Sequence, residues 1–183
     1  MRMNTRRLAI TAAVLACLHA GAPPLLAQDD DDAPAITARV HGTFVDRTGG
    51  AGVLSGDMFV VRFEVRNGLV TAIGRIEGAL ADSTGHVLGR VAEELAMPVG
   101  AVEATCNQLR MDLAATEADV LATRIQFDAQ TAGFDSRDGA TPKAMAALCA
   151  AGDLFGRPST PAVRARTLNE IVGAVKASRG KIR

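Results

Sequence analysis

An antiparallel hairpin between Met58 and Leu80 is the feature that most constrains the fold of this chain. Before a turn at Asn67-Gly68, four apolar side chains alternate with mostly polar neighbours: Phe59, Val61, Phe63 and Val65. After the turn, six residues continue one face of a second strand: Val70, Ala72, Gly74, Ile76, Gly78 and Leu80. Asn-Gly suits the positive φ angles of a type I′ turn, so the pattern predicts a hairpin closed by two residues.

The turn also predicts the register of this hairpin. A two-residue turn places four pairs on one apolar face: Val65–Val70, Phe63–Ala72, Val61–Gly74 and Phe59–Ile76. The opposite, mostly polar face then holds three pairs: Glu64–Thr71, Val60–Arg75 and Met58–Glu77. Turn and pattern agree on this register. The small residues opposite Phe63 and Val61 indicate close packing or a curved sheet.

Alternating apolar residues predict further strands elsewhere in the chain. A half-buried strand is expected where five residues alternate with polar ones: Ile36, Ala38, Val40, Gly42 and Phe44. The segments 107–113 and 121–128 alternate in the same way, although Val102, Cys106, Leu109 and Leu113 also have helical spacing. Residues 47–52 and 82–85 have the composition of turns. Residues 86–104 fit helical and strand spacing equally, because Val87, Val91 and Leu95 satisfy both periods, so this stretch stays open.

Two helices are predicted in the last third of the chain. Thr141-Pro142 and Thr160-Pro161 each offer a capping residue followed by proline at the first helical position. Ala144–Ala151 favours the first helix, and Gly152 is expected to end it. The second helix has an apolar face made by Val163, Leu168, Ile171, Val172 and Val175. Its end is basic, with Lys176, Arg179, Lys181 and Arg183, as is favourable at a helix C-terminus.

Together these patterns predict an α+β fold that is mainly β. The expected architecture is an antiparallel meander or curved sheet of five to six strands, covered or flanked by two C-terminal helices. A single domain is expected over residues 35–178, with a basic tail over 179–183.

The first 27 residues are typical of an export signal. Three arginines, Arg2, Arg6 and Arg7, precede the apolar run Leu8–Leu18, and Ala27 offers a small residue for cleavage. A lipoprotein signal is the alternative, since Cys17 follows Ala16 and an apolar stretch. Either signal places the folded domain outside the cytoplasm, in the periplasm or secreted, or anchored to a membrane through a lipid on Cys17.

Charge and composition narrow the range of partners. Residues 28–34 (QDDDDAP) form an acidic leader that cannot pack, because four successive aspartates repel one another. Loss of the three signal arginines leaves 17 basic against 20 acidic residues, a net charge near −3. That balance argues against a nucleic-acid partner, and the absence of Trp and Tyr leaves little to stack on sugars or bases. Membrane contact is expected only if Cys17 is lipidated.

Several of these residues resemble a group of small, exported, uncharacterised bacterial proteins. The resemblance is carried by the hairpin residues Phe63, Val65, Asn67-Gly68, Val70, Gly74, Ile76, Gly78 and Leu80, by Cys106, Leu109, Met111 and Leu113, and by Cys149. It covers about Gly42 to Val175 and implies strands over 86–98 and 106–113. The chain departs from the pattern at Ala114–Glu117, which puts the strand at 119–128 in question. The resemblance brings no activity.

Removal of the signal leaves two cysteines, Cys106 and Cys149. In an oxidising compartment such a pair is expected to form a disulfide, here between the start of a strand and the first C-terminal helix. The alternative is a redox-active pair, which usually has C-x-x-C spacing and a lowered thiol pKa. The wide spacing therefore favours a structural bond that pins the helices to the sheet.

The sequence offers little catalytic chemistry. His41 and His86 lie outside any metal-ligand motif, and no nucleophile elbow or phosphate-binding loop occurs, so no cofactor or metal is expected. Carboxylates such as Glu64 with Asp112, or Glu93 with Glu94, need a cleft to act as acid and base. The leading expectation is a non-enzymatic extracytoplasmic binding or structural module. The alternatives are a carrier of a small apolar ligand or lipid, with Phe59, Val61, Phe63 and Ile76 inside a curved sheet, and a hydrolase of unrecognised type.

Overall fold

A computed structural model describes residues 36–138 and 140–179. It contains eight strands: β1 (Ile36–Val45), β2 (Ala51–Arg66), β3 (Leu69–Ala81), β4 (Val87–Ala104), β5 (Gln108–Leu113), β6 (Thr116–Val120), β7 (Thr123–Phe127) and β8 (Gln130–Asp135). A short 3-10 turn, η2 (Ser136–Asp138), leads to the helices α1 (Pro142–Phe155) and α2 (Pro161–Arg179). The fold is mainly antiparallel β-sheet with two C-terminal helices, which confirms the predicted fold class.

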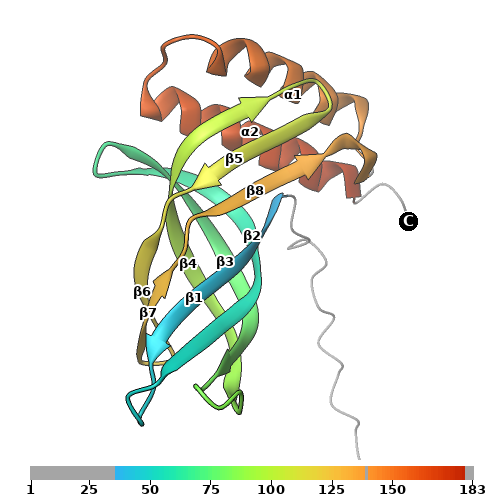
Figure 1. Ribbon diagram of the computed structural model, residues 1–183. Coiled ribbons are helices and arrows are strands. Elements are labelled where there is room, and N and C mark those ends of the chain that lie inside the picture. Colours follow the sequence, from blue (N-terminus) through green and yellow to red (C-terminus); the bar gives the residue numbers. More distant parts are fainter. Residues whose placement is uncertain (1–35, 139, 180–183) are drawn as a thin grey trace, which may run out of the picture.

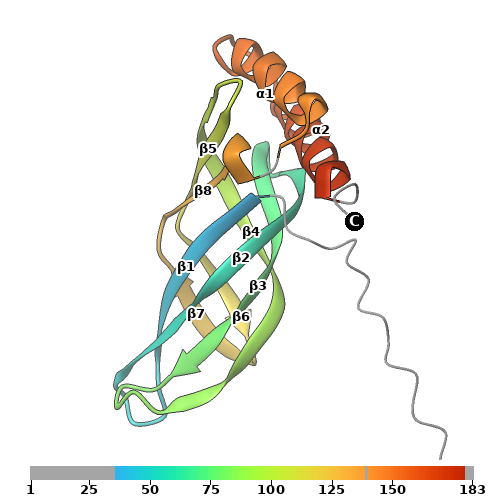
Figure 2. The same ribbon diagram turned by 90° about the vertical axis from the view of Figure 1, so that its right-hand side faces the viewer.

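The sheet closes on itself (Figure 1). Its strands follow the order β2-β3-β4-β5-β8-β1-β7-β6, and β1 also pairs with β2 over its whole length. The other edge of β1 pairs with β8 near Ala38 and with β7 near Gly42. The two C-terminal helices lie across one end of the closed sheet, and the hairpin loops β1–β2 and β3–β4 lie at the other (Figures 1 and 2).

The strand count exceeds the predicted five to six because two long strands are interrupted. Ala114-Ala115 separates β5 from β6, and Asp128-Ala129 separates β7 from β8. The open stretch 86–104 is strand from Val87 onward, as β4. The predicted strand at 121–128 is partly wrong, since Leu121-Ala122 is the turn between β6 and β7 and the strand begins only at Thr123.

The predicted hairpin is present, but its register shifts at Val61. Asn67 and Gly68 have φ angles of 51° and 77°, as a type I′ turn requires. Three predicted pairs are confirmed: Val65–Val70, Phe63–Ala72 and Glu64–Thr71. An irregularity between Val60 and Arg62 then makes the other four wrong, and the partners are Val60–Gly74, Met58–Ile76, Phe59–Arg75 and Asp57–Glu77.

This bulge changes which side chains face the interior. An extra residue in one strand moves the side chains beyond it, counted from the turn, to the opposite face of the sheet. Met58 and Val60 are therefore fully buried, whereas Val61 is exposed and Phe59 only half-buried. The expectation of close packing at Gly74 still holds, because a Cβ atom there would lie 2.7 Å from Cε of Met58 and from the Phe59 carbonyl oxygen.

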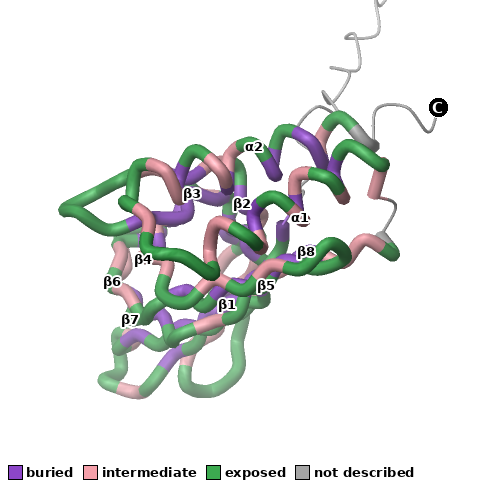
Figure 3. The backbone as a smooth tube through the Cα atoms, turned by 90° about the horizontal axis from the view of Figure 1, so that it is seen from above, coloured by how far each residue is buried: buried purple, intermediate pink, exposed green. Residues whose placement is uncertain are grey.

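Aliphatic and aromatic side chains from the strands fill the interior and continue beneath the helices. The buried cluster includes Ile36, Leu54, Met58, Ile76, Leu95, Met111 and Phe127 from the sheet, and Leu148, Leu168 and Ile171 from the helices. Seen from the helical end, buried segments of α1 and α2 face the strands (Figure 3). Helices and sheet thus share one hydrophobic core.

The predicted helix starts are confirmed, but one predicted helix end is wrong. The hydroxyl oxygens of Thr141 and Thr160 accept hydrogen bonds from the N–H groups of Ala144 and Val163, each at 3.4 Å. Helix α1 continues through Gly152 to Phe155. Gly152 is required there for close approach, because a Cβ atom would lie 2.8 Å from the Ala104 carbonyl oxygen.

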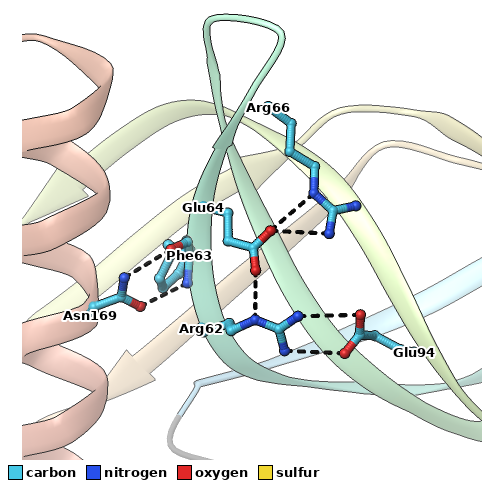
Figure 4. Close-up of polar contacts among 6 residues, drawn as sticks. All are labelled: Arg62, Phe63, Glu64, Arg66, Glu94 and Asn169. Atoms are coloured by element: carbon cyan, nitrogen blue, oxygen red, sulfur yellow. Dashed lines mark hydrogen bonds and ion pairs between the residues drawn. The ribbon is translucent and has the colours of Figure 1, made fainter.

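Asn169 of α2 completes the edge of β2. In the described chain, β1 pairs with β2 only as far as Val60, so the same edge of β2 is left open at Phe63. The Asn169 Oδ1 accepts from the Phe63 N–H at 2.7 Å, and its Nδ2 donates to the Phe63 carbonyl at 2.8 Å (Figure 4). One side-chain amide thus replaces a neighbouring strand.

The predicted signal (residues 1–27), its Cys17 alternative and the acidic leader (28–34) lie outside the described residues, as do residues 180–183 of the basic tail. Within the described ranges, neither helix is long and apolar enough to cross a membrane.

Candidate functional site

A disulfide joins Cys106 to Cys149, as predicted. Their Sγ atoms lie 2.06 Å apart. Cys106 does not open a strand, because it lies in the turn between β4 and β5, and Cys149 lies in the middle of α1. The bond therefore ties α1 to a hairpin turn at the helical end of the molecule, away from the loops of the opposite end.

Two loops of matching structure form that opposite, open end. The β1–β2 loop has the sequence Asp46-Arg47-Thr48-Gly49-Gly50, and the β3–β4 loop has Asp82-Ser83-Thr84-Gly85-His86. In each loop one oxygen of the leading aspartate accepts from the Thr N–H, the Thr hydroxyl and the N–H four residues on. Gly49 and Gly85 both have φ of 83°, which explains the glycine at that position. The shared D-x-T-G pattern is a sequence signal from which the matched loops could have been predicted.

Asp46 also links the two loops to each other. Its second carboxylate oxygen accepts from the Ser83 N–H at 2.9 Å. Hydrogen bonding from Ser83, and then from Thr48, holds the pKa of Asp46 well below its usual range. The Thr84 hydroxyl and then the His86 N–H lower the pKa of Asp82. Both carboxylates are thus ionised acceptors used by the loops themselves.

Asp46→Asn is expected to loosen the open end of the sheet in a pH-dependent way. The depressed pKa means that Asp46 stabilises the fold above its unfolded-state pKa of about 3.9, and that this contribution is lost as the pH falls through the folded-state value. The variant should therefore melt at a lower temperature than the wild type at pH 7, and the difference should shrink below pH 4. Thermal melts between pH 2 and 7 measure this. Asp57→Asn on the exposed face of β2 is the control, and an equal effect of both variants would contradict the assignment.

A hollow of about 510 Å³ lies between these loops and the ends of β4 and β7. Phe44 and Leu80 are its buried apolar residues. Three aliphatic side chains that line it are exposed: Val45 (77%), Leu88 (55%) and Leu121 (48%). Polar lining comes from Asp46, Arg47, Thr48, Asp82 and Thr123. The volume lies in the range of small-molecule sites, and exposed aliphatic side chains that gather at a concave surface mark such sites.

A second hollow of about 660 Å³ adjoins the first. The two share Phe44, Val45 and Thr123, and the second extends along β7 to Gln126. Its charged residues, Glu117 and Arg124, form an ion pair of 2.8 Å between β6 and β7. Leu121 lines the first hollow and Ala122 the second, so the tip of the β6–β7 hairpin lies between two adjoining hollows.

The polar residues noted in the sequence do not converge on this hollow. His41 is exposed on β1, and His86 is exposed in the β3–β4 loop. Glu93 and Glu94 are neighbours on a strand, so they point to opposite faces of β4. Within residues 36–138 and 140–179, no group of His, Cys, Asp and Glu is arranged to hold a metal ion.

Glu64 belongs to an ion-pair network on the outer surface. Its carboxylate accepts from Arg62 at 2.7 Å and pairs with Arg66 at 3.1 Å, while Arg62 reaches Glu94 at 3.1 Å (Figure 4). Asp112 lies on β5, which does not neighbour β2, so the two carboxylates are not brought together. Arg62 and then Arg66 lower the pKa of Glu64, so this group is held ionised rather than poised as an acid.

The fold and its open end define a closed antiparallel sheet with an aliphatic concave mouth. The chain matches no protein-family model, no curated protein and no solved structure. The residues expected to face an apolar ligand inside the sheet are placed differently, since Phe59 and Val61 lie outside the buried core while Phe63 and Ile76 belong to it. The hollow is instead built from strand ends that are far apart in the sequence.

Proposed function

We propose that this chain is a non-enzymatic binding module of the extracytoplasmic space, and that it binds a small apolar or amphiphilic molecule in the hollow at the open end of its sheet. The observation that carries the proposal is the gathering of Val45, Leu88 and Leu121, all exposed, around the buried Phe44 and Leu80. Exposing these side chains to water is unfavourable, and covering them with a ligand would bury apolar surface.

The polar chemistry of the hollow favours binding over catalysis. Asp46 and Asp82 are its carboxylates, and their lowered pKa values keep them ionised near neutral pH. A general acid or base needs a pKa near the working pH and a free path to the substrate. Because both carboxylates already accept the N–H groups of their own loops, they stabilise the shape of the mouth.

The disulfide supports the extracytoplasmic part of the proposal. Disulfides persist in oxidising compartments and are rare in the cytosol. The Cys106–Cys149 bond and the export-type start of the sequence therefore favour the same location by separate routes. Export to the periplasm or outside the cell is part of this proposal.

Leu88→Asn is expected to weaken binding of a neutral apolar probe, 1-N-phenylnaphthylamine, by about fivefold. Loss of part of one aliphatic contact corresponds to about 1 kcal/mol. Fluorescence titration of the exported, oxidised protein gives the affinity. Leu69→Asn is a matched control, because Leu69 is 56% exposed against 55% for Leu88 but lies in the β2–β3 hairpin rather than at the hollow.

The control separates a specific site from general adhesion of the probe. Saturable binding of one probe per chain that falls in Leu88→Asn and is unchanged in Leu69→Asn supports the proposal. Equal loss in both variants, or no saturable binding by the wild type, contradicts it. Native mass spectrometry of the protein from the periplasm would then identify any molecule that co-purifies.

A further inference from the structure

The closed sheet has a seam between β4 and β6. In the described chain, β4 pairs with β3 along one edge, but its other edge joins β5 only from Val99 onward. Among the described strands, β6 pairs with β7 alone, yet it lies beside β4. A hydrogen bond of 2.8 Å from the Ala114 N–H to the Pro98 carbonyl closes one end of the seam. From Pro98 back toward Val87, the edge of β4 faces β6 without backbone pairing among the described residues.

The β6–β7 tip beside this seam has a strained backbone. Leu121 and Ala122 have φ angles of 48° and 58°. Left-handed backbone is unfavourable for residues with a Cβ atom and is unusual for a bulky one such as Leu. The β2–β3 turn, with similar φ angles, uses Asn67-Gly68. The tip is therefore held in a conformation that its own residues disfavour, a situation that clusters at binding sites and switches.

Two contacts of Leu121 hold the tip against β4, next to the buried Val120 at the end of β6. The Leu121 N–H donates to Oε1 of Glu93 at 3.3 Å across the seam. The Leu121 side chain lies over Gly89, where a Cβ atom would be 3.5 Å from its Cδ1. Leu121 also lines the hollow of about 510 Å³. One long hydrogen bond and one partly exposed side chain thus hold Leu121 against β4, where the seam borders the hollow.

We propose that the β6–β7 tip is a gate for the hollow. This inference rests on the proposed function and names its regulation. When the Glu93–Leu121 contact breaks, the tip relaxes from its left-handed conformation and Leu121 leaves Gly89. The hollow then widens along the seam, and an apolar molecule gains lateral access to Phe44 and Leu80. When the gate closes, Leu121 returns to its place over Gly89 and again lines the hollow. Because strain favours the open state and the two contacts favour the closed state, small changes shift the population.

Two variants move the gate in opposite directions without altering the Leu121 side chain. Glu93→Ala removes the acceptor, so amide hydrogen exchange in residues 116–123 is expected to become about fivefold faster. Ala122→Gly relieves the strain, so exchange there is expected to become about fivefold slower. Glu94→Ala is the matched control, because Glu94 is the next residue of β4 and faces outward. It should leave the exchange of residues 116–123 unchanged.

The association rate of 1-N-phenylnaphthylamine, measured by stopped-flow fluorescence, should follow the same order: fastest for Glu93→Ala and slowest for Ala122→Gly. If the probe binds at the hollow but neither variant changes exchange or association, the gate is wrong and the proposed function stands. If exchange responds as expected but no probe binds, the tip is a mobile hairpin without a gating role, and both proposals fail. Unaltered exchange together with absent binding likewise overturns both.

Discussion

Replacing Cys106 and Cys149 with serine is expected to lower the free energy of unfolding by roughly 3–4 kcal/mol. The bond closes a loop over a sequence separation of 43 residues, and in the chain-entropy account this removes freedom from the unfolded state. In the folded state it fixes α1 against the β4–β5 turn. Apart from the disulfide, α1 is held on the core by buried side chains that are small or aliphatic, namely Ala144, Leu148 and Ala151.

Urea unfolding of the oxidised wild type and of the double variant measures this effect. The reductant provides the control, because a reducing agent should lower the stability of the wild type toward that of the variant and leave the variant unchanged. A difference below about 1 kcal/mol between oxidised wild type and variant would contradict a large structural role for the bond. In that case helix packing alone would account for the position of α1.

The features that could be predicted from the sequence are those that depend on the chemistry of one or two neighbouring residues. Asn67-Gly68 predicts its turn because both positions need positive φ, and Thr141 and Thr160 predict the helix starts because their hydroxyls cap free N–H groups. The turn at Leu121-Ala122 could not be predicted in this way, because neither residue favours the left-handed conformation that tertiary contacts impose on it. Gly152 was misjudged as a helix end because glycine serves close packing as well as termination.

The larger errors come from contacts that no local pattern contains. The bulge at Val61 leaves alternation intact on both sides of it, so the sequence suggested an unbroken register and placed Phe59 inside. Closure of the sheet depends on β1 meeting β7 and β8, which lie roughly 90 residues further along the chain. The hollow could not be predicted either, because Val45, Leu88 and Leu121 meet only once the sheet has closed.

Asn169→Leu is expected to destabilise the fold by about 2–4 kcal/mol, because it removes both hydrogen bonds to Phe63 and leaves a part-buried N–H and C=O without partners. Leucine is similar in size and favours helix, so neither volume nor helix propensity explains such a loss. Glu170→Gln, on the exposed neighbouring position of α2, is the control and should change stability by less than about 0.5 kcal/mol.

Asn169→Asp tests the direction of each hydrogen bond. An aspartate still accepts from the Phe63 N–H, but its ionised second oxygen faces the Phe63 carbonyl and repels it. Protonation restores a donor at that position, so the pKa of this aspartate should be raised in the folded protein, and the lost stability should return as the pH falls through that value. Urea unfolding of the three variants at pH 4 and pH 7 measures this recovery. If Asn169→Asp is equally destabilised at both pH values, the amide does not complete the edge of β2 in the manner described. Stability close to that of the wild type in Asn169→Leu would show instead that the apolar face of α2 alone holds the helix on the sheet.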